Sequence, residues 1–170
     1  SMARITLQGN PIATVGDLPA VGSRIPSFRL TKGDLSDVTQ ADFAGRRVVF
    51  NIVPSLDTGV CAASARRFEA EVGALADTLV LTVSNDLPFA QARFCQAEGI
   101  THVIPLSQMR DRAFGRDWGV EIADGPLAGL LSRAVVVADG NGTVVHAQQV
   151  PEIVQEPDYA AALAAVKAIG

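Results

Sequence analysis

Short apolar runs separated by turn residues predict three β-hairpins along this chain. Residues 4–8 (RITLQ) and 12–16 (IATVG) flank a Gly-Asn-Pro turn, which predicts a hairpin at the N-terminus. Residues 28–31 and 36–39 flank Lys-Gly-Asp-Leu and predict a second hairpin. Residues 132–138 and 142–150 surround Asp-Gly-Asn-Gly and predict a third hairpin near the C-terminus.

Between the hairpins, buried strands alternate with helical patterns. Residues 46–53, 77–84 and 101–107 read as strands. Helices are expected from about Val60, over 86–99 with Asp86 as a possible cap and Gly99 as its end, over Arg110–Trp118, and over 157–169. On the first helix, five residues fall near one face: Val60, Ser64, Phe68, Val72 and Leu75.

The order of these elements indicates the fold class. Hairpins followed by β-α-β-α-β-α-β-β-α predict an α/β domain with a mixed central sheet and helices on both faces. A thioredoxin-like fold with an N-terminal β-hairpin addition fits this order. No linker or repeat divides the chain, so a single domain over residues 1–170 is expected, with Ser1 ahead of Met2 read as an expression scar.

Composition and charge narrow the possible partners. The chain has 170 residues, is 48% hydrophobic and 19% charged, and carries a formal net charge of −4. Such a balance gives no basic surface for nucleic acid or an anionic membrane. No apolar run approaches the roughly 20 residues of a membrane span, and the N-terminus lacks the pattern of a secretory signal. We therefore expect a cytoplasmic protein without nucleic-acid or membrane partners.

One cysteine has a setting that favours reactivity. A predicted strand stops at Pro54, and Cys61 follows seven residues later in the first turn of a predicted helix, with Asp57 or Thr58 as its N-cap. The positive end of the helix, the Thr58 hydroxyl and a cation from elsewhere in the chain would each favour the nucleophilic thiolate. The alternative is an inert, buried cysteine that acts as a small apolar residue.

The second cysteine is less informative on its own. Cys95 lies inside a predicted helix beside Phe94, where a core cysteine would be unremarkable, and no C-x-x-C motif is present. It lies 34 positions after Cys61 on a different predicted helix. The two thiols could form a disulfide if their sulfur atoms can meet.

Arg133 opens a strand, and alternation places it on the same face as Val135 and Val137. If that face is buried, the guanidinium needs an anionic partner. Alternatively, Arg133 lies at the end of the strand and reaches solvent.

The remaining candidates point to no cofactor. His102 and His146 stand apart in the sequence, so a zinc site is not expected. Asp-Gly-Asn-Gly is a hairpin turn rather than a phosphate loop. Trp118 and Tyr159 are interpreted as core or interface residues.

Three segments carry a resemblance to a known family. Residues 54–61 (PSLDTGVC) match P-x-x-x-T-x-x-C, which resembles the active-site motif of peroxiredoxins. Together with residues 86–95 (DLPFAQARFC) and the stretch from ADGPL to LLSRAVVV, the chain resembles the bacterial thiol peroxidases, a branch of atypical two-cysteine peroxiredoxins. The resemblance covers nearly the whole chain.

The resemblance implies a thioredoxin-like fold and a defined chemistry. Cys61 would be the peroxidatic cysteine, Cys95 would resolve its sulfenic acid as an intramolecular disulfide, and thioredoxin would reduce that disulfide. Thr58 and Arg133 would hold the thiolate and the peroxide, and Pro54 would support the loop. Hydrogen peroxide and alkyl or lipid-like hydroperoxides would be substrates, without a cofactor or metal, and the protein would be a homodimer.

Two other functions use the same features. The disulfide would act as a switch in a peroxide sensor or a holdase, and inert thiols would fit a thioredoxin-fold binding module. If the peroxidase reading holds, oxidation is expected to unwind the first turn at Cys61, part of the Cys95 helix, or both. Packed helices lie roughly 8–10 Å apart, whereas a disulfide needs Cα atoms within about 7 Å.

Overall fold

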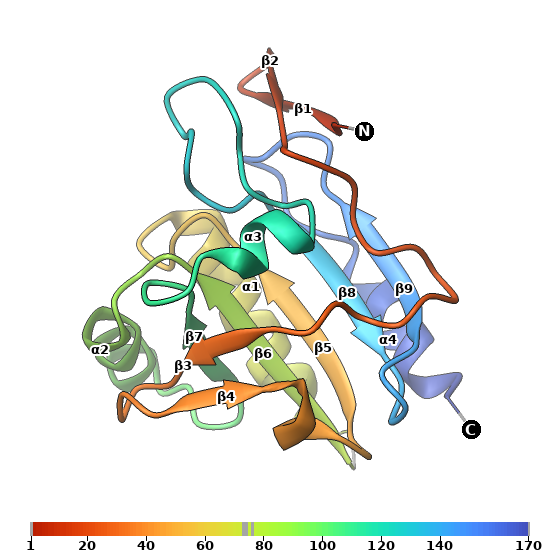
Figure 1. Ribbon diagram of the computed structural model, residues 1–170. Coiled ribbons are helices and arrows are strands. Elements are labelled where there is room, and N and C mark those ends of the chain that lie inside the picture. Colours follow the sequence, from red (N-terminus) through yellow and green to blue (C-terminus); the bar gives the residue numbers. More distant parts are fainter. Residues whose placement is uncertain (1, 73–74, 76, 170) are drawn as a thin grey trace.

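A mixed β-sheet forms the centre of the molecule in the computed structural model, which describes residues 2–72, 75 and 77–169 (Figure 1). Over these residues the sheet has seven strands in the order β4-β3-β7-β6-β5-β8-β9. Its strands are β3 (Arg29–Thr31), β4 (Asp37–Thr39), β5 (Arg47–Ile52), β6 (Thr78–Ser84), β7 (Ile104–Ser107), β8 (Ala134–Ala138) and β9 (Val144–Gln149). Strands β1 (Arg4–Leu7) and β2 (Asn10–Ala13) form a separate antiparallel hairpin.

The pairing of the central strands decides which loops meet. Strand β5 runs parallel to β6 and antiparallel to β8, with Ile52 opposite Ala134. The C-terminal end of β5 and the N-terminal end of β8 therefore lie at the same edge of the sheet. Residues that follow Ile52 are thereby brought close to Arg133, which directly precedes β8.

Helices cover both faces of this sheet. Helices α1 (Gly59–Val72) and α4 (Tyr159–Lys167) pack on one face, whereas the short α3 (Ala113–Asp117) lies on the other (Figure 1). Helix α2 (Pro88–Glu98) contacts β7, and its Phe94 and Cys95 pack on the face that α1 and α4 cover. No helix within the described ranges is long and apolar enough to cross a membrane.

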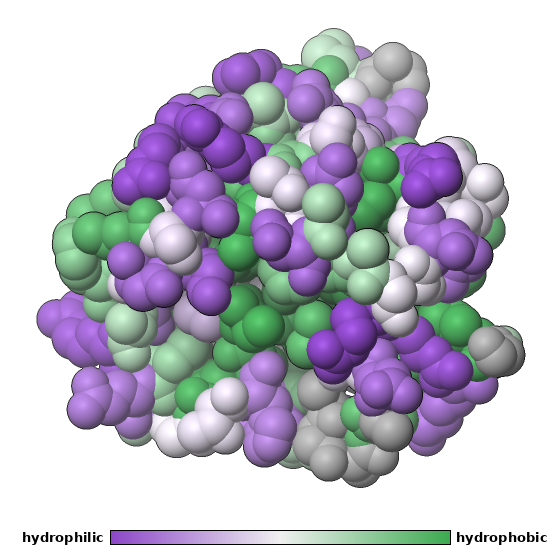
Figure 2. All heavy atoms as spheres, turned by 60° about the horizontal axis from the view of Figure 1, so that its bottom comes forward, coloured by the Kyte–Doolittle hydropathy of each residue, from purple (hydrophilic) through white to green (hydrophobic). Residues whose placement is uncertain are grey.

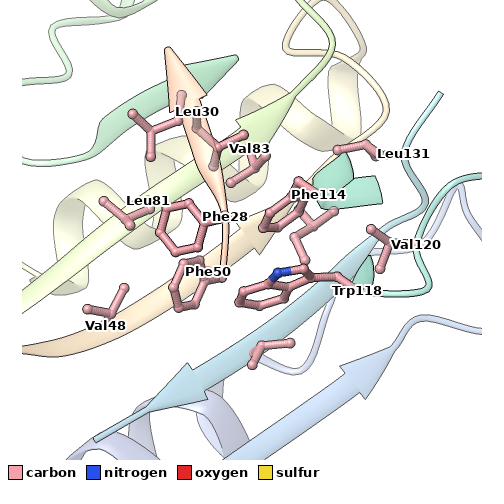
Figure 3. Close-up of a cluster of buried hydrophobic side chains, with 14 of the residues drawn as sticks. Phe28, Leu30, Val48, Phe50, Leu81, Val83, Phe114, Trp118, Val120 and Leu131 are labelled. Atoms are coloured by element: carbon pink, nitrogen blue, oxygen red, sulfur yellow. The ribbon is translucent and has the colours of Figure 1, made fainter. Parts of the chain in front are cut away.

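Alternation along the buried strands divides the core into two layers. Phe50 and Ile52 of β5 belong to an aromatic-rich layer with Phe114 and Trp118 (Figure 3). Val49 and Val53 point to the opposite layer, beneath α1 and α4, which also contains Cys61. Successive side chains of a strand point to opposite faces, so a fully buried strand supplies both layers.

The structure confirms the three hairpins, the alternating strands and helices, and the mixed sheet covered on both faces. The expected turn of the first hairpin is displaced, because Asn10 and Pro11 belong to β2 and the turn lies at Gln8 and Gly9. Helix α1 begins at Gly59, one residue before the expected start. The Schellman-type end of α2 at Gly99 is also as predicted: Gly99 has φ 67° and Ile100 N–H donates to Cys95 O over 2.9 Å. Trp118 is a core residue with no exposed surface.

Two local predictions were wrong, and one short element was missed. Asp86 does not cap α2, because Leu87 precedes the helix without a side-chain cap and the Asp86 carboxylate is bound by other donors. Helix α3 covers only Ala113–Asp117 of the expected Arg110–Trp118, and a 3-10 helix at Gln40–Phe43 was not predicted.

The buried face of α1 also differs from the predicted one. It carries Cys61, Ser64, Ala65 and Phe68, whereas Val60 is partly exposed. Leu75 packs against this layer as expected. The side chain of Val72, and Ser1, lie outside the described part of the chain.

Candidate active site

Cys61 lies at the start of α1, next to the C-terminal end of β5. The chain leaves β5 at Ile52 through the buried residues Val53 and Pro54, and the exposed Thr58 precedes the helix. The Thr58 carbonyl accepts the first helical hydrogen bond, from Ala62 N–H over 2.9 Å. Cys61 therefore sits in the first helical turn, where backbone N–H groups and the helix dipole favour an anion.

The guanidinium of Arg133 contacts the sulfur of Cys61. Arg133 Nη1 donates to Cys61 Sγ over 3.0 Å. Arg133 is 3% exposed and Cys61 is 0% exposed, so the alternative of a solvent-facing arginine is wrong. The same face of β8 carries Val135 and Val137 into the layer beneath α1, as alternation predicted.

The contacts of Arg133 favour a negatively charged sulfur. Among the described residues, Arg133 forms no ion pair with a carboxylate, and its Nε donates to Ile153 O over 2.6 Å. A buried guanidinium without a counter-charge is costly, and its N–H groups can only donate. A Cys61 thiolate supplies both the charge and the acceptor, which is the state that attacks electrophiles.

The N-terminal hairpin braces the segment that orients Arg133. Ile153, whose carbonyl accepts from Arg133, donates its own N–H to Thr6 O over 2.9 Å. Thr6 N–H donates to Pro151 O over 2.8 Å, and the Glu152 carboxylate accepts from Gly9 N–H over 2.8 Å. The hydrogen bond from Gly9, together with further donors, lowers the pKa of Glu152. The hairpin addition is thus linked to the site through residues 151–153.

Thr58 contacts the loop rather than the sulfur. Its Oγ1 donates to Ser55 O over 3.2 Å, in place of the expected contact with Cys61 Sγ. The side chain is exposed beside the start of α1. In this arrangement the hydroxyl orients the loop that leads to Cys61, and its oxygen still has acceptor capacity toward a bound ligand.

A buried polar cluster lies beneath the first turns of α1, and sequence reasoning did not identify it. Ser64 Oγ donates to Cys61 O over 2.9 Å, and Asn51 Nδ2 donates to Ser64 Oγ over 3.3 Å. Both residues are fully buried, and Asn51 Oδ1 accepts no hydrogen bond from the described residues. A lone Asn in an otherwise apolar strand was the signal that could have found it.

Cys95 lies near the same core layer but is not bonded to Cys61. Both cysteines are free thiols, and Cys95 and Phe94 are half-buried against the layer that contains Cys61. Burial raises the pKa of the Cys95 thiol, and the negative charge of Glu69 raises it further. Cys95 is therefore protonated at neutral pH.

Two hollows of the described surface lie away from Cys61. One cavity of about 600 Å³ is lined by Phe28, Phe43, Val48 and Phe50, with Arg24 and Arg46 nearby. It lies at the N-terminal half of β5, whereas Cys61 follows the C-terminal end. Figure 2 shows the side of the molecule that is at the bottom of Figure 1. Apolar side chains lie in the middle of this side, and polar side chains surround them. Across the described residues, no three potential metal ligands gather.

Comparison with known proteins defines the class. The Redoxin family matches residues 20–163. A peroxiredoxin-like protein from Aquifex aeolicus superposes with a TM-score of 0.90 at 38% identity, covering 98% of this chain and 97% of that one. A thiol peroxidase from Chromobacterium violaceum shares the fold at a TM-score of 0.90 and 22% identity, over 96% and 95% of the two chains. The predicted thioredoxin-like fold is confirmed.

Closer relatives specify the branch. The chain is 58% identical over 167 residues to the thiol peroxidases of Mycobacterium bovis and Mycobacterium tuberculosis, covering 98% of this chain and 100% of theirs. The chain therefore belongs to the bacterial thiol peroxidases, which are peroxiredoxin-type oxidoreductases of the redoxin family.

Proposed function

We propose that this thiol peroxidase reduces hydrogen peroxide and organic hydroperoxides with Cys61 as its peroxidatic cysteine. The observation that supports this proposal is the hydrogen bond of 3.0 Å from the buried Arg133 guanidinium to Cys61 Sγ. A thiolate at the start of a helix is the nucleophilic form of cysteine and can attack an O–O bond. The guanidinium of Arg133 has further N–H groups that can donate to the peroxide.

The first step is a displacement at oxygen. The Cys61 thiolate attacks one peroxide oxygen, an S–O bond forms, and the O–O bond breaks. Sulfur is oxidised to sulfenic acid, and the other oxygen leaves as an alkoxide or hydroxide that takes up a proton. Arg133 stabilises the negative charge as it moves from sulfur to the leaving oxygen, and Thr58 orients the peroxide beside the loop.

The second step joins the two cysteines. The Cys95 sulfur attacks the sulfenic sulfur of Cys61, and the sulfenic oxygen leaves as water with the Cys95 proton. The Cys61–Cys95 disulfide is then reduced by the dithiol of thioredoxin, which itself becomes a disulfide. The elevated pKa of Cys95 fits a resolving thiol, because it keeps Cys95 protonated while Cys61 reacts first.

A coupled assay tests this proposal. NADPH oxidation is followed with thioredoxin reductase, thioredoxin and either hydrogen peroxide or cumene hydroperoxide. Cys61→Ser should abolish NADPH oxidation, and it should also abolish peroxide consumption when dithiothreitol replaces thioredoxin. Cys95→Ser should lose only the thioredoxin-dependent NADPH oxidation and should still consume peroxide with dithiothreitol. Near-wild-type peroxide consumption by Cys61→Ser would refute the proposed nucleophile. A single oxidation without continued NADPH use would favour a peroxide sensor or holdase instead.

We also propose a cytoplasmic homodimer. Leu87 and Phe89 at the start of α2 are 56% and 66% exposed, which is unusual for large apolar residues and suits a contact between copies. Sedimentation of the wild-type protein and of Phe89→Asp, across concentration, measures the assembly. A monomeric wild-type protein at every concentration would contradict it.

A further inference from the structure

A single carboxylate lies between the two cysteine-bearing segments. Asp86, in the connection from β6 to α2, accepts from Ser55 Oγ over 2.8 Å with one oxygen. Its other oxygen accepts from Leu56 N–H over 2.8 Å and from Ser84 Oγ over 2.8 Å. Ser55 and Leu56 belong to the loop that leads to Cys61. The carboxylate therefore fastens this loop to the end of β6.

The same network continues into α2. Gln91 Nε2 donates to Ser84 Oγ over 3.1 Å and to Leu106 O over 2.9 Å. Gln91 and Ser84 are fully buried, and Gln91 precedes Cys95 by one helical turn. Hydrogen bonds thus connect Ser55, Asp86, Ser84 and Gln91 without a break.

The network also determines the shape of the Cys61 loop. Ser55 Oγ accepts from Asp57 N–H over 3.1 Å while it donates to Asp86. The Ser55 carbonyl accepts from Thr58 Oγ1 over 3.2 Å. Ser55 therefore connects Asp86 to Thr58, which directly precedes α1, so that a movement of Asp86 would also move Thr58. An ionised carboxylate can accept all three donors at once, whereas an amide has one acceptor oxygen.

We infer that Asp86 is a positioning residue that holds the Cys61 loop and α2 together in the arrangement that attacks peroxide. This inference rests on the proposed roles of Cys61 and Cys95. The same bonds oppose the movement by which the two sulfurs meet, so Asp86 favours the first step and slows the second. In that second step an S–S bond forms, the S–O bond of the sulfenic acid breaks, and water leaves.

The two steps can be measured separately. Rapid mixing of the reduced protein with hydrogen peroxide, acid quenching and mass spectrometry give the amounts of thiol, sulfenic acid and disulfide over time. Asp86→Asn should lower the rate constant of Cys61 oxidation about tenfold, since bonds to a charged acceptor are lost, and should raise that of disulfide formation several-fold. Asp117→Asn, the same charge change at the exposed end of α3, should alter neither.

Opposite changes in the two constants distinguish positioning from a general loss of structure. Unchanged constants in Asp86→Asn, or a parallel fall in both, would overturn the inference. If Asp86→Asn does not fold, Ser55→Ala removes one donor of the network and must show the same opposite changes. If the wild-type protein forms sulfenic acid but no Cys61–Cys95 disulfide, the proposed resolving role is wrong, and the oxidation constant alone then decides the role of Asp86.

Discussion

Arg133 Nη1 and Cys61 Sγ lie 3.0 Å apart, although the two residues are 72 positions apart in the sequence. The antiparallel register of β5 and β8 produces this contact, because Ile52 pairs with Ala134 at one edge of the sheet. Nε of the same guanidinium donates to Ile153 O over 2.6 Å. Ile153 is itself hydrogen-bonded to Thr6 of the N-terminal hairpin. The backbone therefore holds Arg133 at Nε, and Nη1 of the same guanidinium contacts the sulfur.

Replacement of Arg133 should slow Cys61 oxidation with little loss of fold. Arg133→Met removes a charge-assisted donor from a buried site, which commonly costs on the order of 3 kcal/mol, or about a hundredfold in rate. Stopped-flow measurement of sulfenic acid formation gives the rate, and circular dichroism monitors the fold. Arg93→Met, on the exposed surface of α2, serves as the matched control. An unchanged oxidation rate would show that Arg133 does not assist the oxidation of Cys61.

Thr58 should act through its hydroxyl. Thr58→Val keeps the shape of the side chain but loses the donor to Ser55 O and the hydroxyl that is proposed to orient the peroxide. We expect the rate of Cys61 oxidation to fall about tenfold or more, as for a lost hydrogen bond in a transition state. Thr58→Ser retains the hydroxyl and should recover most of the rate. Equal rates in the Val and Ser variants would indicate that the hydroxyl is not used.

Oxidation should loosen both cysteine-bearing helices. In the reduced structure α1 and α2 are continuous over Gly59–Val72 and Pro88–Glu98, and both cysteines are free. A disulfide requires Cα atoms within about 7 Å, whereas packed helices lie roughly 8–10 Å apart. We therefore expect the first turn of α1 at Cys61, the part of α2 around Cys95, or both, to unwind. Amide exchange in peptides around Cys61 and Cys95 should accelerate on oxidation, while β5 stays protected. Equal protection in both redox states would show that the disulfide fits the reduced fold.

Glu69 should contribute to stability in a pH-dependent way. It connects α1 to the segment after α2 by accepting from the N–H groups of Thr101, His102 and Val103. Partial burial raises the pKa of Glu69, but hydrogen bonds, led by that from Val103, outweigh it and lower the pKa from 4.5 to about 2. Because folding lowers this pKa, the stabilisation is complete above about pH 4.5 and is lost as the pH falls toward 2.

Urea unfolding between pH 7 and pH 2 measures this contribution. Glu69→Gln should lower the free energy of unfolding at pH 7 by about 1 kcal/mol, since one amide oxygen replaces two charged acceptors. Its stability should also fall less steeply than that of the wild-type protein below pH 4.5. Glu98→Gln, which breaks an exposed ion pair with Arg66, is the control and should change stability less. Parallel curves for Glu69→Gln and the wild-type protein would contradict the prediction.

The thiol of Cys95 should react slowly at neutral pH. Burial, followed by the charge of Glu69, raises the pKa of Cys95 above its ordinary value of 9.0. In a Cys61→Ser background, iodoacetamide should label Cys95 slowly at pH 8, and labelling should accelerate as the pH rises further. Glu69→Gln removes a negative charge that opposes the thiolate, so labelling at pH 8 should be faster. The urea-unfolded protein gives the rate of the unperturbed thiol.

Several features followed from local signals in the sequence. Turn residues located the hairpins, Pro54 marked the end of β5, and the start of α1 was predicted within one residue. These signals act over a few residues, so the sequence determined that Cys61 would occupy a first helical turn. Alternation along β8 also placed Arg133 on the face of Val135 and Val137, because successive side chains of a strand point to opposite faces of the sheet.

Partnerships between distant residues were decided by the tertiary structure. Asp86 satisfied the local pattern of a helix cap, yet the folded protein places it against Leu56 N–H and two serine hydroxyls, which a buried site must satisfy. The exposed Thr58 hydroxyl donates to Ser55 O because the loop conformation brings that carbonyl within reach. The sequence by itself determined the order of the strands and main helices and the place of Cys61 at the start of α1. Strand register and buried hydrogen-bond donors determined that Arg133 meets this thiol and that Asp86 joins its loop to α2.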